Sequence, residues 1–232
     1  MILFLADIIE ADTAMLTEDE YIHCCKVLRH QEGDIINITD GKGMSAQATI
    51  TSMSKKNATL RLKDIKHHIA PVKEIIIAIA PPKNRGRWEW FVEKSVELGI
   101  TSVTPLKTKN SERVKVNIDR SRKIMRSAAL QSLRYHHPDI KPLQTLNQFL
   151  AHSQEVPNKG SQFIAHYERD NSHLKDVQID TDIRTILIGP EGDFTNEELQ
   201  LAQDHSFQMV NISDNRLRTE TAGIHATSIL SL

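Results

Sequence analysis

The chain is poor in cysteine: only two occur among its 232 residues, and they are the neighbours Cys24 and Cys25. Adjacent cysteines cannot build a disulfide framework, and no second pair stands at the spacing of a structural zinc site. The histidine pairs 67–68 and 136–137 are also adjacent, not four residues apart on one helix face. We therefore expect no bound metal, and a reducing, cytoplasmic location.

Long apolar runs are missing as well. No run approaches the roughly 18 to 20 residues that span a bilayer. The opening MILFLADIIEAD lacks the basic flank and the small-residue cleavage site of a signal peptide. The GxxxxGK[ST] phosphate loop, a GxGxxG turn after the first strand of the second half, and the GxSxG nucleophile elbow are absent. These absences disfavour membrane and secreted proteins, nucleotide hydrolases and dinucleotide dehydrogenases.

The charge that is present is unevenly distributed. The net charge is −1, and 39% of the residues are hydrophobic, which is enough to build real cores. Residues 107–134, however, contain nine Lys or Arg and two acids, so this segment carries +7 and the remainder −8. Such a segment is either a solvated face or a surface for a polyanion, and the charge pattern alone leaves both open.

The first third of the sequence predicts short strands and one helix. Thr17 and Glu20 have capping-box spacing at the start of that helix. The segments 34–38, 44–50 and 58–65 alternate apolar and polar residues and are separated by turn residues. We expect a small β-barrel or sheet covered at one end by the helix. Pro71 marks a linker, so the predicted domains are residues 1–68 and 73–232.

From residue 73 onward, predicted strands and helices alternate. The strands are at 74–80, 101–106, 162–167, 184–189 and 208–213; the helices are at 87–99, 118–134, 195–205 and from about 218 to the end. This rhythm predicts an α/β fold with a largely parallel sheet and helices on both faces. Ligands of such sheets bind beyond the carboxyl ends of the strands. GPEGDF and SDNRLRTE both fall there.

The first of these two loops is followed by a helix start. Thr195 and Glu198 have capping-box spacing, and Gly192 allows a ligand to approach the backbone. A tight turn at Gly189-Pro190 accounts equally well for this glycine- and proline-containing sequence, without any ligand. In the second loop, Glu220 favours a helix start through the helix dipole, again without a catalytic role. The two loops alone therefore predict a pocket but not its chemistry.

Six motifs, taken together in order and spacing, resemble the RsmE family, the ribosomal RNA small subunit methyltransferases E of the SPOUT superfamily. They are IGPEGDFTNEEL, RLRTETAG, EWFVEKSVELGITSVTPL, NSERV, ALQSLR and HCCKVLRHQEGDIINITDG, and the resemblance covers nearly the whole chain. Two dipeptides depart from the family pattern: Gly192-Asp193 replaces Gly-Gly, and Ser213-Asp214 replaces Leu-Gly.

The resemblance implies a PUA-like RNA-binding β-barrel followed by a SPOUT-type α/β domain with a C-terminal trefoil knot. It further implies a homodimer that transfers a methyl group from S-adenosyl-L-methionine to N3 of a uridine in 16S rRNA of the small ribosomal subunit. Two rival functions are a non-catalytic RNA-binding protein, through loss of the cofactor loop at Ser213-Asp214, and a SPOUT methyltransferase that acts on tRNA ribose.

The motifs also imply site residues. The expected cofactor-binding residues are Leu187, Ile188, Gly189, Glu191, Gly192, Ile212, Asn215, Leu217 and Thr219. The basic segment 107–134, together with Arg29 near the start of the chain, supplies the expected RNA-binding residues: Arg29, Arg113, Lys115, Arg122, Lys123 and Arg126. Arg218 is expected to stabilise charge on the reacting uracil, and Glu220 is the nearest carboxylate that can receive a proton. Structural roles for both, a phosphate contact and a helix cap, remain open.

Overall fold

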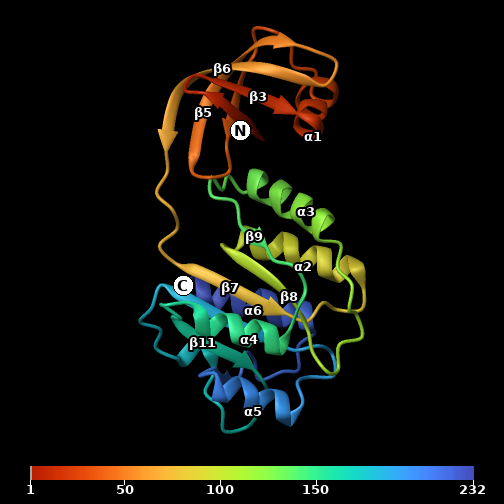
Figure 1. Cartoon of the computed structure of the whole chain (residues 1–232), viewed down its shortest axis with the longest axis vertical. Helices are drawn as coiled ribbons and strands as arrows, with labels where there is room; N and C mark the ends of the chain where they lie inside the picture. Colours follow the sequence, from red (N-terminus) through yellow and green to blue (C-terminus); the bar gives the residue numbers. More distant parts are fainter. Residues whose placement is uncertain (1) are drawn as a thin grey trace. The chain divides into compact units, whose positions relative to one another are not determined.

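A computed structural model describes residues 2–232 (Figure 1). The chain divides into two compact units. The first contains the residues up to Pro71 together with Ala129–His137, and the second contains Val72–Ala128 and Pro138–Leu232. Among the described residues, no helix has the length and apolar character needed to cross a membrane.

The first unit is built on a curled six-stranded sheet with the order β1-β4-β5-β6-β3-β2. Its strands are β1 (Leu3–Leu5), β2 (Asp7–Glu10), β3 (Thr13–Thr17), β4 (Ile35–Thr39), β5 (Met44–Met53) and β6 (Asn57–His67). Only β1 and β4 pair in parallel. Alternate residues such as Ile36 and Ile38 in β4 are buried, so the period-two pattern identifies the core face.

The helical segment of this unit changes type part-way. Helix α1 (Glu18–Tyr21) is followed directly by a π-helix, η1 (Ile22–Val27). The amide of Leu28 donates to the carbonyl of His23, five residues earlier, at 3.0 Å. The wider turn buries the adjacent Cys24 and Cys25 together in the core. Burial raises the pKa of the Cys24 thiol to about 12, which makes it an inert core residue.

Residues 129–137 complete the first unit beside the turn between β4 and β5. The amide of Gly43 donates to the carbonyl of Tyr135, and the amide of His137 donates to that of Gly41, both at 2.9 Å. The rings of His68 and Tyr135 stack with their centroids 3.7 Å apart. These histidines therefore lie in packing contacts, and within residues 2–232 no group of three or more His, Cys, Asp or Glu side chains has a metal-site arrangement.

The second unit contains a seven-stranded sheet in which every pair is parallel, as the sequence predicts. The order is β10-β8-β7-β12-β11-β13, with β9 beside β8. The strands are β7 (Glu74–Ile79), β8 (Ser102–Lys107), β9 (Asp139–Ile140), β10 (Gln144–Thr145), β11 (Ser161–Ala165), β12 (Ile183–Ile188) and β13 (Gln208–Val210). The knot implied by the family resemblance stays a prediction.

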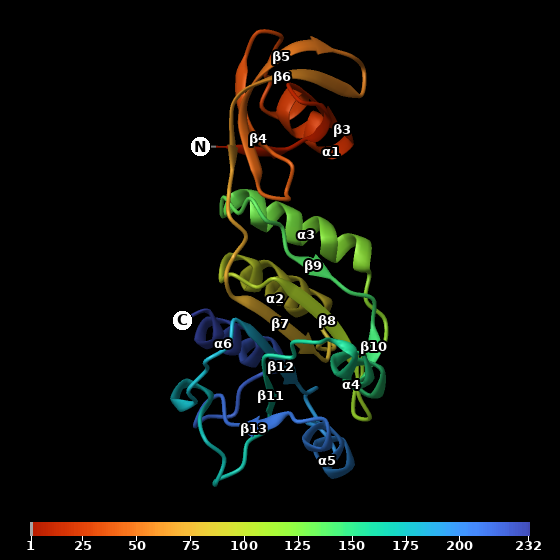
Figure 2. The ribbon, with the colours of Figure 1, turned by 60° about the vertical axis from the view of Figure 1, so that its left-hand side comes forward.

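Helices cover both faces of this sheet (Figures 1 and 2). They are α2 (Arg85–Glu97), α3 (Ile118–Gln131), α4 (Leu146–Glu155), the short 3₁₀ helix η2 (Leu174–Asp176), α5 (Asn196–Asp204) and α6 (Thr219–Ser231). Helices α4 and α5 pack on the face that carries Ala78 and Leu187. On the other face α6 packs against α2 and β7, closely enough that a Cβ on Gly223 would lie 2.6 Å from the ring of Phe91.

Candidate active site

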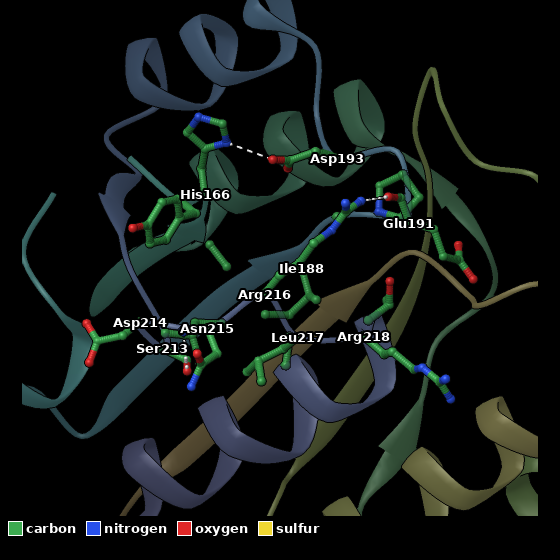
Figure 3. A pocket seen from close by; sticks show the side chains of 17 residues that line it. His166, Ile188, Glu191, Asp193, Ser213, Asp214, Asn215, Arg216, Leu217 and Arg218 are labelled. Atoms are coloured by element: carbon green, nitrogen blue, oxygen red, sulfur yellow. Dashed lines mark hydrogen bonds and ion pairs between the residues drawn. The ribbon is translucent and has the colours of Figure 1, made fainter. Parts of the chain in front are cut away.

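Three neighbouring strands end at one edge of the second unit's sheet. Ala165 of β11 is in register with Ile188 of β12 on one side and Val210 of β13 on the other. The loops that follow these strands enclose a cavity of about 620 Å³, shown in Figure 3. The cavity therefore lies where the carboxyl ends of parallel strands meet, which is the position that the strand pattern predicts.

The loop after β12 is a tight turn that borders this cavity. The amide of Asp193 donates to the carbonyl of Pro190 at 3.0 Å, and Asp193 has φ +60°, in the left-handed region. Aspartate is one of the few non-glycine residues that adopt this region readily. Its Oδ1 also accepts from the amide of Phe194 at 2.7 Å. Asp193 thus meets the conformational demand at a position where glycine is usual in the family.

The predicted capping box behind this turn is confirmed. The Thr195 hydroxyl accepts from the Glu198 amide, and the Glu198 carboxylate accepts from the Thr195 amide. The box satisfies backbone donors at the start of α5. It therefore fixes the exit of the turn.

His166, in the loop after β11, contacts residues at the ends of the two neighbouring strands, β12 and β13. His166 Nδ1 lies 2.9 Å from Asp193 Oδ2, and the His166 amide donates to the carbonyl of Val210 at 3.1 Å. Figure 3 shows this ion pair at one end of the cavity. His166 and Tyr167 line the cavity but were not predicted as site residues. The one feature of the sequence that could have indicated these two residues is their position directly after a predicted buried strand.

The loop after β13 accommodates the second departure from the family pattern. Asp214 Oδ1 lies 3.1 Å from His173 Nε2, and Asp214 is not among the described residues with positive φ. A side chain at this position therefore imposes no left-handed strain. The Arg216 guanidinium donates to the carbonyl of Glu191 at 3.4 Å, which links this loop to the β12 turn (Figure 3).

Most of the predicted cofactor-binding residues lie around the cavity. The lining includes Ile188, Gly189, Glu191, Ile212, Asn215, Leu217 and Thr219. Leu187 does not line it, because adjacent strand residues face opposite sides of the sheet and Leu187 points into the core under α4 and α5. Gly192 does not line it either: a Cβ there would lie 3.1 Å from the Cβ of Asn110. The absence of a side chain at Gly192 allows the backbone to pack closely against Asn110.

The two residues proposed from sequence for the chemistry lie at the start of α6. Arg218 is the exposed N-cap residue of this helix and lines the edge of the cavity. In Figure 3 its side chain points away from Asp214. The Glu220 side chain is only 7% exposed, and its Oε1 lies 3.4 Å from Arg87 Nε. Glu220 does not line the main cavity; it lines a smaller one with Arg218.

The predicted RNA-binding residues are distributed over both units. Arg29, which has φ +62°, lies in the first unit and is exposed. In the second unit Lys115, Arg122 and Lys123 are exposed, and Arg113 and Arg126 are half-buried. Helix α3 thus presents cations to solvent, which suits either of the two interpretations of the basic segment.

Comparison with known proteins decides the family. The profile of the RNA methyltransferase domain matches residues 69–231, and that of the RNA methyltransferase PUA domain matches residues 16–63. The ribosomal RNA small subunit methyltransferase E of Synechocystis is 30% identical over 222 residues, which are 93% of this chain and 71% of that relative. The chain belongs to the RsmE family.

Other RsmE proteins match along most of their length. The enzyme of the same name from Rickettsia conorii is 29% identical, covering 94% of this chain and 88% of the relative. A crystal structure of RsmE from Neisseria gonorrhoeae bound to S-adenosyl methionine is 28% identical, with a TM-score of 0.83 over 98% of this chain and 95% of that one. A SpoU methyltransferase from Streptomyces viridochromogenes, 11% identical with a TM-score of 0.50 over 76% of this chain and 67% of its own, shares the fold alone.

Proposed function

We propose that this RsmE-family protein methylates N3 of a uridine in 16S rRNA of the small ribosomal subunit, with S-adenosyl-L-methionine as methyl donor. The observation that carries the proposal is the cavity built by three strand-end loops in a chain of this family. Its volume of about 620 Å³ lies within the range of small-molecule sites. The Neisseria relative carries this cofactor. We further propose a cytoplasmic location for an activity on this substrate.

The residues present fit such a cofactor. Ile188, Ile212 and Leu217 supply apolar walls for a ring and an alkyl chain, while Asn215 and Arg216 supply polar groups. Arginine is suited to a carboxylate because its planar fork can donate two parallel hydrogen bonds. When bound, S-adenosylmethionine supplies a methyl group that its sulfonium centre has already activated.

The remaining task for the protein is to prepare the uridine. N3 of uracil carries a proton, so it is a poor nucleophile until a base accepts that proton. Negative charge then spreads over O2 and O4, where a guanidinium can stabilise it. Arg218 lies at the edge of the cofactor cavity, with its side chain exposed. We therefore assign to Arg218 the stabilisation of the developing uracil anion.

The assignment predicts a selective loss of turnover. Arg218→Ala should still bind cofactor and RNA but should methylate on the order of 100 to 1000-fold more slowly. Arg218→Lys should recover only part of this loss, because an ammonium lacks the planar fork. The measurement is single-turnover kinetics with saturating small ribosomal subunits that lack the modification. A loss that disappears at saturating RNA would make Arg218 a binding residue only.

The reaction itself is tested by the product. After incubation of unmodified small ribosomal subunits with the protein and S-adenosylmethionine, mass spectrometry of the nucleosides should detect 3-methyluridine. A ribose-methylated nucleoside would show that the target atom is wrong. Calorimetry that detects no cofactor binding, together with normal RNA binding, would instead support a non-catalytic RNA-binding protein.

A further inference from the structure

A cavity of about 350 Å³ lies at the opposite end of the parallel sheet from the proposed cofactor site. It is lined by Glu74, Ser102 and Ile183, the first residues of β7, β8 and β12, and by helix α4. The proposed cofactor cavity begins at Ile188, the last residue of β12, on the order of 15 Å further along that strand. Among the described residues, none lines both cavities. We call this site the α4 cavity.

The floor of the α4 cavity is a row of mostly polar side chains from four adjacent strands. In register, the row consists of Gln162, Thr185, Ile76 and Ser102. Two residues further along the strands, the same face carries Ile164, Leu187 and Ala78, which pack in the core with α4 and α5. Sheet faces that helices cover are normally apolar. This face therefore changes from an apolar core to a polar floor within one step of the register.

Two polar side chains of this floor have no protein partner. Gln162 and Thr185 are only 7% and 5% exposed. Among residues 2–232, neither the Gln162 amide nor the Thr185 hydroxyl makes a hydrogen bond to another group of the chain, although both residues line the cavity. Buried polar groups are normally satisfied by protein, water or ligand. A glutamine amide donates and accepts side by side, and it can therefore pair with the edge of a nucleobase.

The walls of the α4 cavity are apolar. Ile76 and Ile183 of the sheet contribute to them, together with Phe149 of α4 and Val156, which follows α4. Small-molecule sites combine such a lining with a few polar groups that fix the orientation of the ligand. An aliphatic chain would also fill these walls, but it would leave the Gln162 amide unpaired. A flat ring with a polar edge satisfies both the walls and the floor.

Basic side chains outnumber acidic ones around the cavity. Lys141, Lys159 and His152 line it, and Glu74 is the one acid among the described residues that do so. Lys141 Nζ donates to Asp139 Oδ2 at 2.7 Å, which leaves two of its three N–H groups for a ligand. The lining therefore favours a ligand that carries negative charge in addition to its ring.

We infer that the α4 cavity binds a nucleoside monophosphate; the inference does not depend on the methyl-transfer reaction. The base lies between the apolar walls with its edge on Gln162 and Thr185, and the phosphate lies near Lys141 and Lys159. The volume of about 350 Å³ is within the range of small-molecule sites. Inorganic phosphate alone would leave both the walls and the floor without a partner.

The first test is calorimetry with the cofactor cavity filled. The protein is saturated with S-adenosylhomocysteine and titrated with AMP, and we expect one AMP to bind per chain. Adenosine, which lacks the phosphate, and N6,N6-dimethyl-AMP, which lacks the amino N–H, should each bind roughly 10-fold more weakly. No AMP binding, or binding that occurs only without S-adenosylhomocysteine, would overturn the inference. Equal affinity for AMP and both analogues would overturn it as well.

Three variants locate the binding within the chain. Thr185→Val and Gln162→Leu remove a floor group and should each weaken AMP binding roughly 10-fold, with the affinity for S-adenosylhomocysteine unchanged. Lys141→Ala changes an exposed residue, so it tests the site even if a floor variant fails to fold; it should weaken the binding of AMP but not of adenosine. Gln203→Leu, at an exposed position of α5 outside the cavity, is the matched control. Unchanged AMP affinity in the folded variants would overturn the site.

Discussion

Asp193 combines a backbone requirement with a side-chain contact. Its φ of +60° is strained for most residues, while its carboxylate pairs with His166 and caps the amide of Phe194. A single residue thus sets the turn after β12 and joins it to the loop after β11. The sequence showed the departure from Gly-Gly, but the partner His166, in the loop after β11, lies 27 residues away and has no sequence signature.

This dual role predicts different outcomes for two substitutions. Asp193→Gly should change the free energy of unfolding by less than about 1 kcal/mol, because glycine accepts the left-handed region but loses the two side-chain contacts. Asp193→Val should cost about 1 to 2 kcal/mol more, because a branched residue is strained there. Urea denaturation provides the measurement. Equal stability of the two variants would show that the positive φ carries no cost at this position.

Residues that line the cavity were predictable where a motif followed a strand, and not where the strand lay outside the motifs. Ile188, Gly189 and the residues after β13 follow from the rule that ligands bind beyond strand ends. Leu187 does not line the cavity, because the register of β12, not its sequence position, decides which side chains face the loops; its role in cofactor binding stays a prediction. His166, which lines the cavity, was missed because it lies outside the six motifs, and its position follows only from the pairing of β11 with β12 and β13.

At the scale of elements, Glu89 joins α2 to α3. Its carboxylate accepts from Arg120 Nε and Nη2 at 2.5 and 2.9 Å, and from Arg85 Nε at 2.6 Å. The Arg120 and Arg85 guanidinium groups lower the pKa of Glu89 from its ordinary value of 4.5 to about 2. The folded state therefore favours the ionised carboxylate.

A depressed carboxyl pKa predicts an acid-dependent contribution to stability. The contribution should be complete above pH 4.5 and lost as the pH falls from 4.5 towards 2. Glu89→Gln should destabilise the protein at pH 7 by on the order of 1 kcal/mol after allowance for solvent screening. The difference from the unaltered protein should shrink in urea titrations at pH 4 and 3. Asp119→Asn, whose carboxylate is 91% exposed beside Arg122, should show almost no effect at any of these pH values.

The basic face of α3 carries a second prediction at this scale. If Arg122, Lys123 and Arg126 contact phosphates, replacing all three with alanine should weaken RNA binding and reduce the slope of log affinity against log salt by about 0.7 to 0.9 per charge. Filter binding or anisotropy from 50 to 300 mM salt measures this slope. Lys175→Ala on η2 is the control and should leave it unchanged. An unaltered slope in the triple variant would mean that α3 is merely solvated.

Helix α4 shows what local patterns can and cannot reveal. Its capping box of Thr145 and Gln148 and its buried Leu146, Phe149 and Leu150 are all visible as letters in the sequence, yet this helix was not predicted. Strands β9 and β10, by contrast, have two residues each, too few for any period. The strand order could not be predicted for a different reason. Strand β12 pairs with β7, although more than 100 residues separate them, and no local propensity encodes that pairing.

At the scale of the whole molecule we predict a homodimer. Ile224 and Ile229 on α6 are half-buried within one chain and therefore available to a partner, whereas Leu230 of the same helix is fully buried and is not. Light scattering at micromolar concentration should report twice 26.3 kDa. Ile224→Glu should shift the equilibrium towards the monomer, with circular dichroism as the control for folding. An active protein of monomer mass would contradict this prediction.

The first unit is discontinuous in sequence, because Ala129–His137 lies beside the turn between β4 and β5. During synthesis the chain emerges from the N-terminus, so its β-sheet can begin to form early but lacks its last segment until His137 has left the ribosome. By then β7, α2 and β8 of the second unit have already been made. A fragment that stops at residue 68 would accordingly leave the Gly43 amide without the Tyr135 carbonyl and the Gly41 carbonyl without the His137 amide.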